Sequence, residues 1–342
     1  MMIRDALAQL IDGCDLSLDQ AESAMAEIMA GEATDAQIAG FLVALRSKGE
    51  TVDEIAGLAR AMRTESTRVE TKSTSLVDVC GTGGDGLGTF NISTTVSFVA
   101  AGAGCAVAKH GNRSVSSRCG SADVLEELGV CLDLGANAVG QCIDELGIGF
   151  LYAPRLHPAM KHAVGPRREM GIRTVFNLLG PLTNPACAHV QLLGVYDPTY
   201  TEPLARVLQT LGGRSAFVVH GGGGLDELST LGPSRVTQLA GDRIESFVLD
   251  ARSLGLPKAS LADLRGGDAC ENAFILRSIL AGEPGPKRDI VLLNAACVLV
   301  AAGRSADLAK GLAVAAESID SGTARHCLDA LISLTQRLGE RR

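Results

Sequence analysis

Apolar residues recur every three to four positions along roughly the first 65 residues of the chain. Residues that can cap a helix precede three such stretches, at Ser17, Thr34 and Thr51. After the last two, Gln37 and Glu54 stand where each side chain can reach back to the free backbone amide of the cap. The pattern therefore predicts a small all-helical N-terminal domain, which we place at residues 1–66.

The pattern changes at Leu76, where short apolar runs begin to alternate with helical patterns. The runs that predict strands lie at 76–79, 105–108, 149–152, 190–196 and 215–220. Helical patterns stand between them, from about residue 94 and at 121–128 and 201–211. Strands that alternate with helices are typical of an α/β domain with a largely parallel sheet, which we expect over residues 72–342.

The most apolar run, residues 290–302, is too short to span a bilayer, and Asn294 interrupts it. It predicts a buried core helix, and no membrane partner is expected. The N-terminal residues lack the pattern of a signal peptide. The ten cysteines include no CxxC pair, which argues against a zinc site and favours a reducing compartment, hence the cytoplasm.

Hydrophobic residues make up 46% and charged residues 20% of the 342 positions, as in ordinary soluble globular proteins. Aromatic residues make up only 3%, and the formal net charge is -8. Proteins that bind nucleic acid usually carry a basic surface, and those that bind single strands add stacking aromatics. Nucleic acid is therefore not an expected partner, and an anionic ligand would need a local cluster of positive charge.

A glycine-rich segment, residues 80–94, follows the first expected strand and leads into a helix. Glycines at such a junction let backbone amides converge on an oxyanion, and the helix N-terminus adds free amides and the positive end of a dipole. Thr89, Asn91, Ser93 and Thr94 add short polar side chains for phosphate oxygens or for magnesium. The segment has neither the dinucleotide fingerprint nor a Walker loop. A tight structural turn is the alternative, but so many polar residues at one junction favour a phosphate site.

Residues 86–122 contain no Asp or Glu, although acids outnumber bases in the chain as a whole. Because Lys109, Arg113 and Arg118 lie in this window, it should form a locally positive basin. Lys109 is a point charge suited to pyrophosphate, Arg113 offers a planar fork, and Asn112 can both donate and accept hydrogen bonds. An expected strand ends just before these residues, which places them in the crevice where open α/β sheets bind ligands. An ordinary solvated loop is the alternative for the basic residues alone.

Residues 155–173 contain five Lys or Arg and one acid, Glu169. A guanidinium in this segment would hold a substrate carboxylate well. The spacing does not choose between Arg167, Arg168 and Arg173, and a solvated basic helix face is the alternative for any one of them.

Asp226 and Glu227 are adjacent carboxylates that follow an expected strand and a run of glycines. Magnesium prefers such oxygen ligands, with water and substrate phosphate completing its octahedron. An ordinary acidic surface pair explains these two residues about equally well. His110 and His157 are interpreted as structural, with direct proton transfer as the minor alternative.

Taken together, these segments resemble the anthranilate phosphoribosyltransferase family. The matching motifs run in the family's order along the chain: Gly81-Thr-Gly-Gly-Asp85, Asn91-Ile-Ser-Thr94, Lys109-His-Gly-Asn-Arg-Ser114, Gly120-Ser-Ala-Asp123, His157-Pro-Ala-Met-Lys161, Gly171-Ile-Arg-Thr174, Phe176-Asn-Leu-Leu-Gly-Pro-Leu-Thr-Asn-Pro185 and Leu225-Asp-Glu227. As a set they are specific, although each alone is modest. Cys119 stands where the family commonly has Ser.

The resemblance implies transfer of the phosphoribosyl group from phosphoribosyl pyrophosphate (PRPP) to the amine of anthranilate in tryptophan biosynthesis, with release of pyrophosphate. It implies that the larger domain is of the nucleoside-phosphorylase-like phosphoribosyltransferase type. It also implies that helices from about 168–186 join the small domain, and that the protein is a homodimer through its small domains.

The resemblance places PRPP against the glycine-rich segment, the basic segment and the start of the following helix. The residues it implies for PRPP are Gly81, Gly84, Asp85, Thr89, Asn91, Ile92, Ser93, Thr94, Lys109, His110, Gly111, Asn112, Arg113, Ser114, Val115, Ser116, Ser117 and Ser121. Those for anthranilate are Gly81, Asn112 and Arg167, with His110 and Pro181 near its path.

The resemblance also implies two magnesium ions, one at Ser93 and another at Asp226 with Glu227. No residue is assigned as a general base, because the amine of anthranilate is uncharged at neutral pH and needs positioning more than a strong base.

Two other functions share the implied fold. A pyrimidine nucleoside phosphorylase would cleave a nucleoside with inorganic phosphate, and magnesium dependence would distinguish it. A non-catalytic nucleic-acid-binding relative would show strongly salt-dependent binding. The excess of acids and the intact glycine and Asp-Glu motifs argue against the second.

Overall fold

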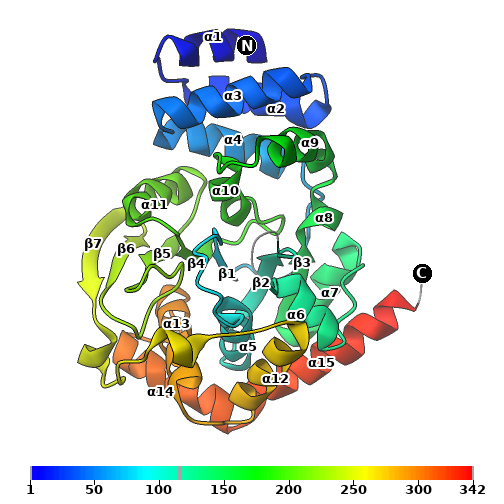
Figure 1. Ribbon diagram of the computed structural model, residues 1–342. Coiled ribbons are helices and arrows are strands. Elements are labelled where there is room, and N and C mark those ends of the chain that lie inside the picture. The colour runs from blue at the N-terminus through cyan, green and yellow to red at the C-terminus, as the bar shows by residue number, and fades with distance from the viewer. Residues whose placement is uncertain (1, 115–117, 341–342) are drawn as a thin grey trace.

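The computed structural model describes residues 2–114 and 118–340 (Figure 1). The N-terminal bundle consists of α1 (Ile3–Ile11), α2 (Leu18–Ala30), α3 (Asp35–Lys48) and α4 (Val52–Thr64). Ser17, Thr34 and Thr51 each accept a hydrogen bond from the amide three residues on, at 3.3 Å. The predicted helical segment and its capping boxes are therefore confirmed.

The rest of the chain is built around a mixed sheet, which within the described residues has the order β3-β2-β1-β4-β5-β6-β7. The strands are β1 (Leu76–Gly81), β2 (Ala106–Gly111), β3 (Ile148–Tyr152), β4 (Val190–Gly194), β5 (Ser215–His220), β6 (Ser234–Ala240) and β7 (Arg243–Leu249). The first five pair in parallel, as predicted. The antiparallel hairpin β6–β7 extends one edge and was not among the predicted strands.

Helices cover the sheet and extend beyond it (Figure 1). They are α5 (Ile92–Gly102), α6 (Ser121–Glu127), α7 (Ala136–Leu146), α8 (Ala153–Leu156), α9 (Lys161–Met170), α10 (Phe176–Leu179), α11 (Thr201–Thr210), α12 (Ala269–Leu280), α13 (Pro286–Ala301), α14 (Leu308–Asp320) and α15 (Thr323–Gly339). Among the described residues no helix is both long and apolar enough to cross a membrane.

The two faces of the sheet bury separate clusters of apolar side chains. Leu192 and Val219 belong to the cluster under α5 and α13, whereas their neighbours Leu193 and Val218 point to the opposite face. This second cluster includes Phe41 and the other buried residues of the N-terminal bundle. The bundle, joined by α9 against α2 and α3, therefore shares one core with a face of the sheet.

The predicted core helix at 290–302 lies within α13, and its one polar interruption has a clear role. Asn294 is fully buried, and its side chain bonds the backbone N–H and C=O of Leu228, each at 2.9 Å. A buried amide satisfied in this way fixes a loop far away in sequence. The loop is the one that carries Asp226 and Glu227.

The prediction that β2 would end at residue 108 was wrong. The strand continues to Gly111, because its ladder with β3 extends from Val107 to Gly111. Lys109 and His110 therefore lie within a central strand and are buried, instead of following it in a loop. In the sequence, the polar residues Lys109 and His110 indicated a loop. The groups that allow them to be buried lie on other parts of the chain, which a local pattern does not reveal.

Candidate active site

A loop of residues 82–91, here called the glycine loop, joins the end of β1 to the start of α5. Gly81, at the end of the strand, lies so close to Asp226 that a Cβ would overlap its carboxylate. Within the loop, the Gly83 amide donates to Asp226 Oδ2 at 2.7 Å. The glycine at position 81 therefore permits the close approach of two loops at the carboxyl ends of parallel strands, the usual ligand site of such sheets.

Three carboxyl groups, those of Asp85, Asp226 and Glu227, meet beside the glycine loop and form what we call the carboxylate cluster. Burial and the neighbouring Asp85 raise the pKa of Asp226 to about 7. Burial and Asp226 also raise the pKa of Glu227 well above its ordinary value, while Lys109 and the Ser93 amide oppose that rise. Asp85 Oδ2 is buried and has no hydrogen-bond partner among the described residues. The protein surroundings therefore do not compensate the negative charge of the ionised cluster, which favours a bound proton or a cation.

A divalent cation fits this charge imbalance. Among the described residues no group of three or more His, Cys, Asp or Glu forms a ready metal cage. Magnesium does not need one, because it is usually held by one or two carboxylates together with water and substrate phosphates. The donors present are oxygens, including the Ser93 hydroxyl at the start of α5, which suits magnesium better than a softer metal.

Lys109 is the cation that the fold itself places near the cluster. Lys109 is 4% exposed, and its positive charge opposes the rise that burial causes in the pKa of Glu227 and of the buried Asp78. His110 follows Lys109 in β2, so its side chain points to the opposite face of the sheet. The backbone amide of His110 donates to Asp78 Oδ1 at 3.1 Å. The buried Asp78 therefore fixes the strand that positions Lys109.

His110 and His157 form a buried pair with ring centroids 5.1 Å apart. Burial lowers the pKa of His110 to about 3 and that of His157 to about 4, so both rings are neutral at pH 7. His110 Nδ1 lies 3.2 Å from the Gly180 carbonyl, which can only accept, so Nδ1 carries the proton. Its Nε2 is buried, has no partner among the described residues and is then a free acceptor. A ring with so low a pKa is a poor base.

Asn91 joins three segments that are remote in sequence. Its Oδ1 accepts from Asn272 Nδ2 at 2.9 Å, and its Nδ2 donates to the Cys119 carbonyl at 3.3 Å. Asn272 was not predicted as a site residue. Its role depends on a contact across 181 positions of the chain, which no local pattern reveals.

The segment after β2 is held against α6. Arg113 forms ion pairs with Asp123 at 3.0 Å and Glu126 at 2.7 Å, so its guanidinium is already engaged. Ser121 Oγ donates to the Asn112 carbonyl at 3.3 Å, and the Ser114 amide donates to Asp123 at 3.1 Å. At Gly111 a Cβ would overlap Ser121 Oγ. Val115, Ser116 and Ser117 lie outside the described residues.

The structure separates the three candidate arginines of residues 155–173. Arg167 is half-buried on α9, its guanidinium lies 4.8 Å from the ring centre of Phe176, and burial lowers its pKa. Arg168 is exposed. Arg173 donates to the Gly84 carbonyl and lies over Tyr196, so it braces the glycine loop. Within the described residues neither Arg167 nor Arg168 has a hydrogen-bond or ion-pair partner, and of these two only Arg167 is partly buried.

The remaining predicted residues lie around the same loop. Thr89 pairs with Arg265 in an isolated antiparallel bridge. The side chain of Ile92 is in the core, so only its backbone can face a ligand. The Thr94 hydroxyl is buried and finds no hydrogen-bond partner in the part of the chain that the structure describes. The Pro181 carbonyl accepts from Gln191 at 2.6 Å.

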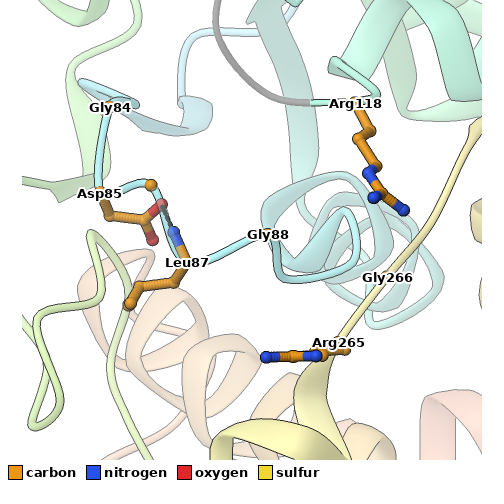
Figure 2. Close-up of a pocket in the computed structure, with 8 residues that line it drawn as sticks. Gly84, Asp85, Leu87, Gly88, Arg118, Arg265 and Gly266 are labelled. Carbon is orange, nitrogen blue, oxygen red and sulfur yellow. Dashed lines mark hydrogen bonds between the residues drawn. The ribbon is translucent and has the colours of Figure 1, made fainter.

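A cavity of about 410 Å³ opens beside the glycine loop (Figure 2). It is lined by Gly84, Asp85, Gly86, Leu87, Gly88, Arg118, Arg265 and Gly266. Arg265 was missed in the sequence analysis, although the glycine pair after it marks a turn.

The chain is similar along its length to known proteins. Residues 73–325 match the model described as "Glycosyl transferase family, a/b domain", and residues 4–66 match its helical bundle domain. The anthranilate phosphoribosyltransferase of Moorella thermoacetica is 57% identical over 97% of this chain and 98% of its own. This chain belongs to the anthranilate phosphoribosyltransferase family.

Solved structures of anthranilate phosphoribosyltransferases share the fold. That from Thermus thermophilus matches with a TM-score of 0.93 at 46% identity, covering 97% of this chain and 99% of the other. That from Saccharomyces cerevisiae, in complex with PRPP and Mg, matches with a TM-score of 0.89 at 28% identity, covering 98% of each chain. The same yeast protein has been solved in complex with 4-fluoroanthranilate. The predicted family and its two-part fold are confirmed.

The buried histidine pair predicts a stability that depends on pH. When the pH falls below 6.5, the ordinary histidine pKa, these two histidines bind protons in the unfolded chain but remain neutral in the folded protein. The free energy of unfolding should therefore decrease as the pH falls from 6.5 toward about 4. The decrease should be about 1.4 kcal/mol per pH unit for each histidine. Urea unfolding of His157→Gln across this range should show a shallower pH dependence than the unsubstituted protein. His326→Gln, at an exposed position, is the control. Equal slopes for His157→Gln and the unsubstituted protein would contradict the prediction.

Proposed function

We propose that this protein transfers the phosphoribosyl group of PRPP to the amine of anthranilate, giving N-(5-phosphoribosyl)anthranilate and pyrophosphate in tryptophan biosynthesis. The observation that carries the proposal is the carboxylate cluster beside the glycine loop. Buried, repelling acids with raised pKa values need a cation, and a glycine loop at a helix N-terminus needs an anion. A magnesium complex of a pyrophosphate ester satisfies both at once. The family to which the chain belongs supports the same reaction.

PRPP occupies the glycine loop, the start of α5 and the end of β2 in this proposal. Three predicted PRPP residues have a buried polar side-chain atom without a partner among the described residues: Asp85, Thr94 and His110. Lys109 faces the departing pyrophosphate and balances the charge that develops on it. Ser93 holds one magnesium ion, and Asp226 with Glu227 a second. Bound magnesium would neutralise phosphate oxygens and favour departure of the pyrophosphate.

Anthranilate lies between α9 and the glycine loop. Arg167, which lacks a hydrogen-bond partner within the described residues, receives the carboxylate, and Asn112 and Gly81 line the path with Pro181. His110 offers its Nε2 as an acceptor for the amine. Because that ring is a weak base, it orients the amine and leaves the chemistry to positioning and electrostatics.

The domain division at 1–66 and 72–342, with residues 168–186 joining the small domain, also belongs to the proposal, as does a homodimer through the small domain. Five exposed large apolar residues lie on or beside α1, α3 and α9, of which α3 packs against the other two: Met2, Ile11, Val43, Val164 and Ile172. Such residues on neighbouring helices are typical of a subunit interface. We place the protein in the cytoplasm, as the free cysteines favour.

The reaction is tested by the loss of anthranilate fluorescence with PRPP, with and without magnesium. Magnesium-dependent loss, matched by an equal amount of released pyrophosphate, is expected. No loss in a folded sample with magnesium would overturn the proposal and direct the search to nucleosides.

Removal of the carboxylates should weaken magnesium use. Asp226→Ala and Glu227→Ala should each raise the magnesium concentration needed for half-maximal activity by about tenfold or more, because each removes a proposed ligand. Magnesium titrations of the initial rate measure this, and Asp242→Ala, an exposed acid after β6, is the control. The variants should remain folded in thermal unfolding, since each relieves charge repulsion. An unchanged magnesium requirement would remove these residues from the metal site.

Loss of Arg167 should affect anthranilate more than PRPP. Arg167→Ala should raise the KM for anthranilate by about tenfold or more, because a charge-assisted hydrogen bond to its carboxylate is lost. The KM for PRPP should stay within about twofold of the unsubstituted value. The matched control is Arg168→Ala, the exposed neighbour on the same helix. The assignment fails if the two variants show the same KM for anthranilate.

A further inference from the structure

We propose that Arg118 and Arg265 together bind a phosphate group of the phosphoribosyl donor in the cavity beside the glycine loop. The inference rests on the proposed function and adds two residues to its site. Neither arginine lies in the set that the family resemblance implies.

The two side chains come from different parts of the chain and line the same cavity. Figure 2 shows the side chains of Arg118 and Arg265 at separate places around the cavity, and the carboxylate of Asp85, in the glycine loop, at a third. The cavity, at about 410 Å³, is in the range of small-molecule sites. Its lining therefore carries two guanidinium groups and one carboxylate.

Arg265 is held in place by its backbone. The Gly266 amide donates to the Gly88 carbonyl at 3.0 Å, and the Phe90 amide donates to the Leu264 carbonyl at 3.2 Å. A Cβ at Gly266 would overlap the Phe90 backbone, so only glycine lets the two segments approach this closely. These contacts fix the start of the Arg265 side chain at the rim of the glycine loop. A solvated surface arginine needs no such support.

Both guanidinium groups are available for a ligand. Within the described residues, neither has a hydrogen-bond or ion-pair partner, whereas the nearby Arg113 is held by two carboxylates. A planar guanidinium matches two phosphate oxygens at once, and two of them can bridge one phosphate group. Over residues 2–114 and 118–340, the fold thus leaves both guanidinium groups unpaired beside a loop whose backbone amides favour the same kind of ligand.

The charge pattern orients the donor. Magnesium-bound phosphate oxygens belong at the carboxylate cluster, so the arginines of the cavity receive oxygens that the metal leaves free. PRPP has two such sources, the pyrophosphate and the 5-phosphate. Their chemistry at a guanidinium is the same, and inhibitors that carry only one of them distinguish the two.

The test compares Arg265→Met and the double variant Arg118→Met/Arg265→Met with the unsubstituted protein. The KM for PRPP should rise about tenfold in the single variant and further in the double variant, because charge-assisted hydrogen bonds to phosphate are lost. The KM for anthranilate should change less than about twofold. Arg265→Lys should restore only part of the loss, since an ammonium lacks the fork. Arg243→Met, at an exposed arginine paired with Glu245 on the edge strand β7, is the control.

Inhibition by pyrophosphate and by ribose 5-phosphate identifies the phosphate that is bound. The inhibitor whose inhibition constant rises in Arg265→Met carries the group held by the arginines. A KM for PRPP in the double variant within about twofold of the unsubstituted value would overturn the proposal.

A binding measurement distinguishes failure of the arginine site from failure of the proposed function. Stabilisation of the protein by PRPP with magnesium in thermal unfolding needs no turnover. If the unsubstituted protein is stabilised but inactive with anthranilate, the reaction is wrong, and loss of stabilisation in the double variant still supports the arginine site. Equal stabilisation of both proteins refutes that site.

Discussion

The burial of negative charge at the carboxyl ends of the central strands is the constraint on which the site depends. Asp226 and Glu227 lie in a loop that two neighbouring loops and a core helix hold in place. A Cβ at Gly81 or at Gly194 would overlap Asp226 itself, and Asn294 fixes the next turn through the backbone of Leu228. The fold therefore positions repelling acids at a stability cost that a bound cation or a proton relieves. Buried acids that repel one another are typical of a ligand site and not of a structural core.

Much of the fold could be predicted because its signals are local. A capping box such as that at Thr34 lies within four residues, and a parallel strand such as β5 is a continuous apolar run. The hairpin β6–β7 could not be predicted in this way, because neither strand is a continuous buried run and β7, at the sheet edge, has no buried residue. The predicted end of β2 was wrong for another reason. Lys109 and His110 are tolerated inside it only through partners on other elements, such as Asp78 and Gly180.

The same distinction between local and long-range signals applies to the site. The glycine loop and the Asp226-Glu227 pair were found because several chemical groups occur close together in sequence. Asn272 and Arg265 were missed because each reaches the loop from a segment more than 170 positions away. Arg167, Arg168 and Arg173 were equivalent by spacing. Their burial and partners separate them, since Arg173 braces Gly84 and Arg168 is exposed. Only tertiary contacts carry this information.

In the proposed reaction, the neutral histidine pair would favour orientation over proton transfer. A histidine at its ordinary pKa of 6.5 would be partly charged at neutral pH, and a cation beside Lys109 would repel the positive charge that develops on the ribose during displacement. Burial removes that charge and fixes the His110 proton on Nδ1 through the Gly180 carbonyl. What remains at Nε2 is a lone pair that can align an amine without competing for its proton until the new bond is well formed. The same desolvation that weakens the base therefore leaves a more selective hydrogen-bond acceptor.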